Sequence, residues 1–512
     1  MTQSQFVSKE LHIAPMLDVS TREFRQFIRI LSRKCVIWTE MIVDETLVHS
    51  SNPSEHLCYD EFNTVNVDTD LVKCNDYKMK ETSSHPIVCQ IGGIQPNDTA
   101  TAIKFVEQFG YDEVNLNIDC PSSRVSGKQF GAILMKKANS AKAIVCAMKK
   151  NAKSIPISVK TRIGIDDFDS FDYLVQFIQE LIDCGCYRFI IHSRICILDG
   201  LSPAQNRLIP PLNYPRVYAL CRRFPSCEFI INGGIPGLKA ARQICYGMNS
   251  TIITDSVSLS LEQNSHPSKE YQYHSHSVPC SICNISNGSC IFKHATQQDV
   301  PSNLKGCMLG RAVMNNPAMF HDVDRYFYGE KQNPCKTRKE ALFHYCQYLE
   351  SVYPRRCCDT DVHVTMNINT SKVTKMSQTQ NFCWICTNLY NGKTHIYQYE
   401  WCNHEKCSKL KINVGKPIAS SSKPTMKSKI SSGVIDRSLK PILGIFYGLK
   451  CSKSFRRVCD QLSRNLLIRN CGPGFILRLA LLSVPEEFLD QIFTNTEHLL
   501  AKDVPLHAGP VR

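Results

Sequence analysis

Short apolar runs alternate with helix-like segments over most of the first 311 residues. Eight of these runs are compact, rich in β-branched residues, and end in polar residues or glycine, which predicts strands. The eight predicted strands are HIAPML, CVIWTEM, PIVCQIGG, EVNLNIDCP, ISVKTRI, FIIHSR, EFIINGG and GCMLGR. Eight strand–helix units favour a (β/α)₈ TIM barrel over an open, doubly wound sheet.

The segments between the strands carry apolar residues at the helical period. In 20–32 the apolar positions fall at i, i+3, i+4 and i+7, and the same spacing recurs in 171–185. Ser20 followed by Glu23 has the spacing of a capping box, so we expect the first helix to begin there.

Two long polar stretches interrupt this pattern and are predicted to be insertions. They span about residues 248–304 and 357–437, and neither has a sustained hydrophobic period. We therefore predict a catalytic barrel domain over 1–330 and a C-terminal helical domain over 331–512. The second domain should contain helices in 337–356 and 438–465.

Composition narrows the class of protein. Of the 512 residues, 43% are hydrophobic and 21% charged, which is typical of a soluble globular protein. The net charge of +14 favours a polyanionic partner such as nucleic acid. No apolar run reaches the ~18 residues of a membrane span, and the first residues lack the apolar core of a signal peptide. We expect a cytoplasmic monomer whose 27 cysteines are reduced thiols or metal ligands, not a disulfide framework.

In a (β/α)₈ barrel the chemistry lies at the carboxyl ends of the strands, and here these ends are consistently polar. The residues at the eight ends are Pro15, Met16 and Leu17; Glu40; Gln90; Asn117 and Cys120; Lys160 and Arg162; His192 and Arg194; Asn232, Gly233 and Gly234; Gly310 and Arg311. We expect them to form a ring around one site.

The last two strand ends suggest a phosphate site. Gly233 and Gly234 precede one helix, and Gly310 and Arg311 precede another, so backbone N–H groups are free to face an anion. The loops after strands 7 and 8 are also where such barrels commonly bind phosphate. These glycines favour a phosphate-bearing cofactor over simple turns. Lys160 could stabilise negative charge on a reduced flavin, and the position of His192 beside Arg194 favours a place in the site.

Cys120 ends the fourth strand and has four possible roles. A buried structural thiol is the commonest role for a free cysteine. A metal ligand would need a second cysteine at another strand end, and the sequence has none there. A nucleophile needs a lowered pKa, which neighbouring Asp119 opposes. A thiol that stays protonated could act as a general acid.

Several motifs together resemble the tRNA-dihydrouridine synthases, specifically the A-type subgroup. The motifs are APMLDVSTREFRQFIR, QIGGIQP, NLNIDCPSSRVSGKQFGAILM, SVKTRIGIDD, IHSRICILDGLSPAQNRLIPPLNYPRVY, INGGI, MLGRAVMNNP and KPILGIFYGLKCSKSFRRVCDQL. The resemblance covers about residues 11–247, 306–329 and the C-terminal motif. It implies a tRNA-dihydrouridine(20/20a)-type synthase, in which FMN and NADPH reduce a D-loop uridine to 5,6-dihydrouridine.

The resemblance also implies roles for individual residues. Hydride from the flavin would reach C6 of the uracil, and Cys120 would protonate C5. The flavin would contact Pro15, Met16, Leu17, Gln90, Lys160 and His192, with its phosphate on Asn232, Gly233, Gly234, Gly310 and Arg311. The residues expected to contact tRNA are Asn117, Arg194, Arg207, Lys453, Arg456 and Arg457.

The chain departs from the family's usual residues at three positions. Asp119 stands where a glycine is usual, Ile195 where a lysine is common, and Ser123 where an acidic residue is usual. Two other functions are therefore kept open: an FMN-barrel oxidoreductase acting on a free pyrimidine, and an inactive RNA-binding relative.

The insertions contain cysteines and histidines at spacings compatible with zinc. These are Cys280, Cys283, Cys290 and His294 in the first, and Cys383, Cys386, Cys402, His404 and Cys407 in the second. No apolar pattern around them supports a zinc finger, so unligated thiols are the preferred interpretation, and any bound zinc is expected to be structural.

Overall fold

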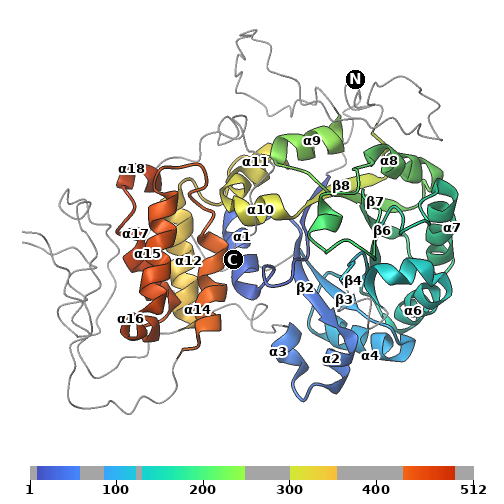
Figure 1. Ribbon diagram of the computed structural model, residues 1–512, viewed down its shortest axis with the longest axis horizontal. Helices are drawn as coiled ribbons and strands as arrows, with labels where there is room; N and C mark the ends of the chain where they lie inside the picture. Colours follow the sequence, from blue (N-terminus) through green and yellow to red (C-terminus); the bar gives the residue numbers. More distant parts are fainter. Residues whose placement is uncertain (1–8, 58–85, 123–129, 248–299, 354–429, 491–512) are drawn as a thin grey trace, which may run out of the picture.

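The computed structural model describes residues 9–57, 86–122, 130–247, 300–353 and 430–490. Figure 1 shows a barrel with a helical bundle beside it. The strands are β1 (Glu10–Ile13), β2 (Ile37–Val43), β3 (Ile87–Gly92), β4 (Glu113–Ile118), β5 (Ile157–Arg162), β6 (Arg188–His192), β7 (Glu228–Asn232) and β8 (Leu304–Leu309). The eight predicted strands are thus confirmed, and so is the (β/α)₈ architecture.

The strands are all parallel and close into a barrel. Their order is β1-β8-β7-β6-β5-β4-β3-β2, and a bridge from His12 to Val36 joins the two ends of the sheet. Side chains pointing inward fill the barrel, including Trp38, Ile190 and Met308, each at most 1% exposed. The interior is therefore a packed core, and any ligand site must lie at a rim.

Helices surround the strands and line the loops at their carboxyl ends. They are α1 (Arg22–Leu31), α2 (Asp44–His49), α3 (Pro53–Leu57), α4 (Pro96–Gln108), η4 (Gly131–Lys136), α6 (Ala138–Asn151), α7 (Phe171–Ile182), η5 (Gln205–Arg207), α8 (Tyr214–Arg223), α9 (Leu238–Tyr246), α10 (Arg311–Asn315), η8 (Pro317–Asp322) and α11 (Val323–Tyr326). The two helices expected within 20–32 and 171–185 are present as α1 and α7.

The expected cap of α1 is wrong by one residue. Thr21, not Ser20, is the N-cap and accepts a hydrogen bond from the N–H of Phe24. The hydroxyl of Ser20 instead donates to the carbonyl of Ala14 and accepts from the N–H of Met16. Ser20 therefore shapes the loop after β1, a tertiary role that competes with capping.

A helical bundle follows the barrel and packs against α1. Its helices are α12 (Arg338–Val352), α14 (Ser432–Leu439), η10 (Lys440–Ile442), α15 (Ser452–Arg464), α16 (Leu466–Asn470), α17 (Pro473–Leu481) and α18 (Glu486–Leu489). Phe27 of α1 meets Tyr345 of α12 with 5.0 Å between ring centroids. Lys440 reaches the carbonyl of Asp18 in the loop after β1, at 2.6 Å. The bundle is thereby fixed next to the barrel mouth.

Two details of the bundle differ from the prediction. Segment 438–465 is not one helix, because turns separate η10 from α15, and Gly448 within them has a positive φ of 78°. In addition, α14 begins at Ser432, inside the range expected to be an insertion. None of the helices in the described ranges is both long enough and apolar enough to span a membrane.

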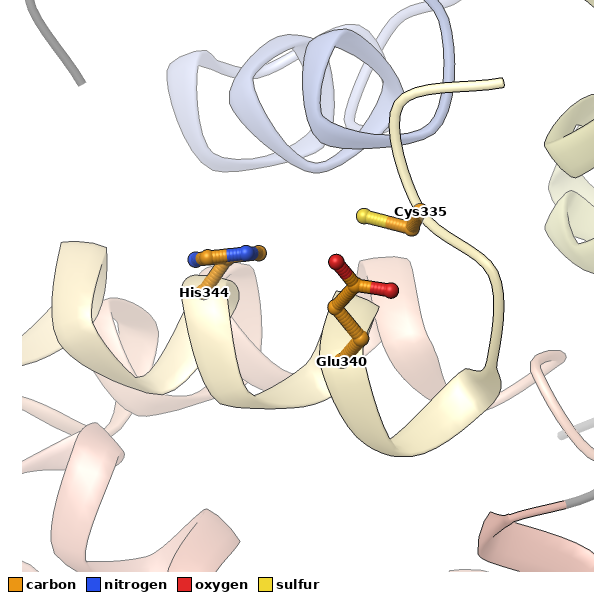
Figure 2. Close-up of side chains that lie close together, drawn as sticks. All are labelled: Cys335, Glu340 and His344. Atoms are coloured by element: carbon orange, nitrogen blue, oxygen red, sulfur yellow. The ribbon is translucent and has the colours of Figure 1, made fainter. Parts of the chain in front are cut away.

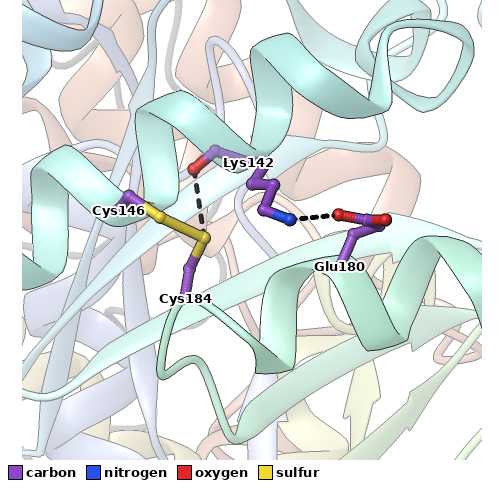
Figure 3. Close-up of a disulfide and its surroundings, with 4 residues drawn as sticks. All are labelled: Lys142, Cys146, Glu180 and Cys184. Atoms are coloured by element: carbon purple, nitrogen blue, oxygen red, sulfur yellow. Dashed lines mark hydrogen bonds and ion pairs between the residues drawn. A yellow bond between two sulfur atoms is a disulfide. The ribbon is translucent and has the colours of Figure 1, made fainter.

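The expectation that all cysteines are reduced is wrong for one pair. Cys146 of α6 and Cys184, just after α7, form a disulfide with their Cα atoms 4.9 Å apart (Figure 3). Neighbouring helices of the outer layer bring the two residues together across 38 positions of sequence, which spacing alone does not reveal.

An ion cluster closes the amino end of the barrel. Arg188 at the start of β6 pairs with Glu10, with Glu113 at 2.8 Å and with Glu228 at 2.7 Å. Glu10 also contacts Nε2 of His12 at 2.8 Å. Burial alone would raise the pKa of Glu10, but His12 and Arg188 lower it to about 2. This end therefore carries charged, mutually satisfied groups with three carboxylates around one arginine.

Candidate active site

The strand register brings the predicted site residues together at the carboxyl end of the barrel. Asn117 on β4 lies beside Lys160 on β5, and Arg162 at the end of β5 lies beside His192 on β6. His192 in turn pairs with Asn232 on β7. These five residues come from four strands that lie far apart in the sequence, yet the strand pairing places them side by side along one edge of the barrel mouth.

Asp119, which follows β4, is the centre of a buried ion cluster. One carboxylate oxygen, Oδ2, pairs with Nζ of Lys160. The other, Oδ1, lies 3.0 Å from Nε of Arg162 and 3.1 Å from Nδ1 of His192. A carboxylate only accepts hydrogen bonds, so the proton on the His192 ring must be on Nδ1, which leaves Nε2 as an acceptor.

The protonation states follow from this arrangement. Burial would raise the pKa of Asp119, but Lys160, Arg162 and His192 hold it well below its usual range. Burial and the nearby Arg162 lower the pKa of His192 to about 3 despite the opposing carboxylate. At neutral pH Asp119 is therefore ionised and His192 is neutral.

Cys120 is the next residue and is half-buried at the mouth. Burial raises the pKa of its thiol, and the negative charge of Asp119 raises it further. Its backbone is fixed, since its N–H donates to Oδ1 of Asn117 at 3.1 Å and its carbonyl accepts from the N–H of Ala132 at 3.0 Å. The site thus holds a protonated, positioned thiol that solvent and ligands can reach.

Asn117 and Gln90 are more deeply placed than expected for ligand contacts. Asn117 is 5% exposed, donates to the side-chain oxygen of Gln90 at 2.9 Å, and accepts from the N–H groups of Asp119 and Cys120. In the described structure the side chain of Asn117 therefore positions the Asp119–Cys120 turn. Direct contact of Asn117 with tRNA stays a prediction.

The loops after β7 and β8 fit an anionic group. Gly233 and Gly234 have positive φ values of 118° and 64°. A Cβ on Gly233 would lie 2.9 Å from the His192 ring, and one on Gly234 would lie 2.5 Å from Leu212. α9 then begins after Gly237 without a side-chain cap, so its first N–H groups are open to a ligand. Gly310 follows β8, which pairs with β7. A Cβ placed on Gly310 would lie 3.8 Å from Sδ of Met16.

Three further arginines lie around the same mouth. Arg194 is 9% exposed and its Nε has no hydrogen-bond partner, while its Nη1 donates to the carbonyl of Pro210. Arg311 donates to the carbonyl of Arg207 at 3.0 Å. Burial lowers the pKa of Arg311, and the charge of Arg207 lowers it further. This excess of positive charge fits a phosphate-bearing ligand.

An apolar rim surrounds the cations. Leu17, Phe168, Leu208 and Ile209 are large apolar residues that are 48–58% exposed, and all lie in loops at the carboxyl ends of strands. Pro15 and Met16 are half-buried beside Leu17. The mouth therefore offers apolar surface next to charge, as a planar aromatic ligand requires.

The basic helix of the C-terminal bundle is α15. Lys453, Arg456 and Arg457 are all exposed on it, and Nε of Arg456 donates to the carbonyl of Leu443 at 2.8 Å. Ile442, Ile445 and Phe446, in the segment before α15, are buried. Among the described residues, the side chains of Lys453, Arg456 and Arg457 on α15 are thus exposed to solvent.

The zinc candidates of the two insertions lie outside the described residues, as does Ser123. Within the described ranges, one group of three potential ligands occurs, Cys335, Glu340 and His344 (Figure 2). Each already has a protein partner: Cys335 the carbonyl of Ile30, Glu340 the N–H of Lys336, and His344 the side chain of Gln347. The group is explained by packing and capping at the start of α12.

Sequence reasoning missed the central role of Asp119. It placed Arg162 in the ring of strand-end residues but did not predict its pairing with a carboxylate. Arg162 is two positions after Lys160 on β5, so both side chains lie on one face of the strand. This spacing was the signal in the sequence that two cations would lie close together. Nothing in the sequence indicated that Asp119 would turn back toward β5 and β6, because it lies just beyond the strand.

Comparison with known proteins shows which family the chain resembles. The sequence profile of the family described as Dihydrouridine synthase matches residues 12–253. The protein named tRNA-dihydrouridine(20/20a) synthase from Pasteurella multocida is 40% identical over 251 residues, or 49% of this chain and 69% of that protein. The protein of that name from Escherichia coli K12 is 41% identical over 48% of this chain and 65% of its own length.

A third relative extends the similarity into the C-terminal region. The Vibrio cholerae protein of the same name is 32% identical over 344 residues, covering 67% of this chain and 80% of that protein. The matches with the first two span about two thirds of the relatives' lengths. Because the identity and coverage are of this size, the chain belongs to the dihydrouridine synthase family.

Proposed function

We propose that the protein is a tRNA-dihydrouridine synthase that reduces a D-loop uridine with FMN and NADPH. The observation that carries the proposal is the protonated thiol of Cys120 at a barrel mouth that is rich in positive charge. Family membership and the printed name of the relatives supply the reaction class.

Cys120 supplies the proton of the reaction. The chemistry that FMN contributes when bound is hydride transfer to C6 of the uracil, with NADPH as the reductant. The thiol of Cys120 then donates its proton to C5, where negative charge would otherwise collect. Burial keeps the thiol protonated until that moment, and its half-exposed position lets water return the proton afterwards.

The remaining site residues hold the cofactor in this proposal. Lys160 and His192 face its polar ring edge, and the Gly233–Gly234 loop with Gly310 and Arg311 receives its phosphate. The fit rests on the glycine cradle and the uncapped start of α9. The half-buried Pro15 and Met16 offer an apolar surface to the ring system.

The bundle binds tRNA in this proposal. A uracil inside folded RNA must leave its stack to enter a barrel mouth, so the enzyme needs a second surface that grips the backbone. The exposed cations of α15, together with Arg437 and Lys440 in the pocket beside the loop after β1, provide that surface.

Mass spectrometry of unmodified tRNA incubated with the protein, FMN and NADPH tests the function. We expect dihydrouridine to form, and Cys120→Ala to reduce its formation by ~10²-fold or more while NADPH oxidation continues. Cys227→Ala, at the opposite end of the barrel, is the matched control and should behave as the wild type. Unchanged tRNA reduction in Cys120→Ala would remove the proton-donor role.

Two further measurements, reduction of free uridine and reconstitution with FMN, separate the two alternatives. Reduction of free uridine as efficiently as tRNA would favour an oxidoreductase of free pyrimidines. A colourless protein that cannot be reconstituted with FMN would favour an inactive RNA-binding relative. The exposed basic face of α15 favours an RNA substrate over a free pyrimidine. Flavin binding and tRNA reduction distinguish an active enzyme from an inactive RNA-binding relative.

A further inference from the structure

The carboxylate of Asp119 divides its two oxygens among three partners at the barrel mouth. Oδ2 pairs with Lys160, and Oδ1 contacts both Arg162 at 3.0 Å and His192 at 3.1 Å. All four side chains are largely buried, and Asp119 is the most exposed of them at 16%. Water therefore screens these charges only weakly.

Asp119 sets the net charge of this cluster. Lys160 and Arg162 are two positions apart on one face of β5, so two positive charges are held close together. His192 contributes no charge at neutral pH because its pKa is lowered to about 3 by burial and by Arg162. With Asp119 the cluster carries a net charge of one positive unit, and without it two.

Asp119 also fixes the orientation of His192. Because Nδ1 donates to the carboxylate, Nε2 points as an acceptor toward the loop after β7, 3.3 Å from where a Cβ on Gly233 would lie. Lys160 and His192 are both proposed to face the cofactor. Asp119 is bonded to both, so it acts on the cofactor through them.

We propose that Asp119 is a positioning residue and built-in counter-ion that lowers the reduction potential of the flavin bound at this site. The inference rests on the proposed flavin chemistry. Reduction adds negative charge to a flavin, and fixed positive charge nearby stabilises the reduced form. Asp119 cancels the charge of one of the two neighbouring cations. The reduced flavin is therefore a stronger hydride donor toward uracil, and reduction of the oxidised flavin by NADPH is less favourable.

The direct test is the midpoint potential of the flavin bound to wild type and to Asp119→Asn, measured by equilibration with a reference dye. The asparagine has the same shape and lacks the charge. We expect the variant to bind reduced flavin about tenfold more tightly relative to oxidised flavin, which raises the two-electron potential by about 30 mV. Asp119→Ala serves the same purpose if the asparagine variant does not fold.

Two further variants separate charge from structure. Glu228→Gln removes the same charge at the opposite end of the barrel and should leave the potential unchanged. The double variant Asp119→Asn/Lys160→Met returns the cluster to one positive charge and should bring the potential back toward the wild-type value. Equal potentials in wild type and flavin-loaded Asp119→Asn would overturn the inference and leave Asp119 a purely structural role.

The outcomes distinguish this inference from the proposed function. A wild-type protein that binds flavin but does not reduce tRNA would defeat the function and leave the potential shift measurable. Dihydrouridine synthesis by wild type with no shift in the variant would defeat only the inference. A wild-type protein that cannot bind flavin would overturn both.

Discussion

The two ends of the barrel carry the same kind of ion cluster with the charges exchanged. At the amino end, Arg188 is shared among Glu10, Glu113 and Glu228. At the carboxyl end, Asp119 is shared among Lys160, Arg162 and His192. The first cluster has an excess of negative charge, and the second, with Arg194, Arg207 and Arg311 around it, an excess of positive charge.

The difference shows how one scaffold separates stability from function. Each cluster satisfies inward-pointing charged groups, which a packed barrel would otherwise bury without partners. Among the described residues, the three carboxylates at the amino end disfavour an anion. The cationic end can bind a phosphate and can stabilise a reduced flavin, so the chemistry belongs there and not at the amino end.

The largest effect should come from breaking the acidic end. Arg188→Met leaves three carboxylates without their shared cation, and we expect the free energy of unfolding to fall by about 3 kcal/mol. Urea denaturation measures the change, while the potential of bound flavin should stay as in wild type. Lys305→Met is the control, since Lys305 is 3.9 Å from Glu228 and its loss should cost under about 1 kcal/mol. Equal losses in the two variants would mean that Arg188 does not organise this end.

The cationic end should give the protein a pH-dependent stability through His192. Its pKa is lowered to about 3 in the folded protein by burial, then by Arg162, so the unfolded chain binds the extra proton between pH ~6.5 and 3. The contribution of His192 to the free energy of unfolding is therefore fully present above pH ~6.5. It falls on acidification, by up to ~1.4 kcal/mol per pH unit.

Denaturation curves at pH 7.5, 6 and 5 test this dependence. His192→Gln should flatten the loss of stability relative to wild type, whereas His49→Gln, at an exposed position of α2, should not. Parallel pH profiles for wild type and His192→Gln would show that His192 is protonated in the folded cluster, against the site described above.

A smaller effect should follow from trimming the phosphate side of the cationic end. Arg311→Ala removes one charge-assisted hydrogen bond to a phosphate, so we expect the dissociation constant of FMN to rise about tenfold. Riboflavin, which lacks the phosphate, should bind wild type and variant alike. A variant that weakens both ligands equally would instead place Arg311 at the ring system.

The smallest effect concerns tRNA and extends the comparison to the bundle. The double variant Arg456→Ala/Arg457→Ala should weaken tRNA binding and reduce the salt dependence by about one to two units of slope, because each phosphate contact contributes about 0.9. Reduction of bound flavin by NADPH should be unaffected. The control Lys149→Ala/Lys150→Ala removes two exposed cations at the end of α6, near the acidic end of the barrel, and should change neither quantity. Equal behaviour of the two double variants would place the tRNA elsewhere.

The sequence by itself determined the barrel, since the eight apolar runs and the amphipathic segments between them leave little choice of architecture. It also placed Cys120, Lys160 and His192 at one rim, because parallel strands put their carboxyl ends together. The sequence motifs indicated the family, and the comparisons confirm it. These features depend on local periodicity and on order along the chain, and both can be read without coordinates.

Only the tertiary structure decided which groups touch. The pairing of Asp119 with β5 and β6, the replacement of Ser20 by Thr21 as the cap of α1, and the Cys146–Cys184 disulfide each depend on where a side chain just outside a regular element turns. The break between η10 and α15 is of the same kind. Hydrophobic periodicity specifies the elements and their buried faces, whereas contacts between charges at loop ends depend on distances of a few ångströms between segments far apart in sequence.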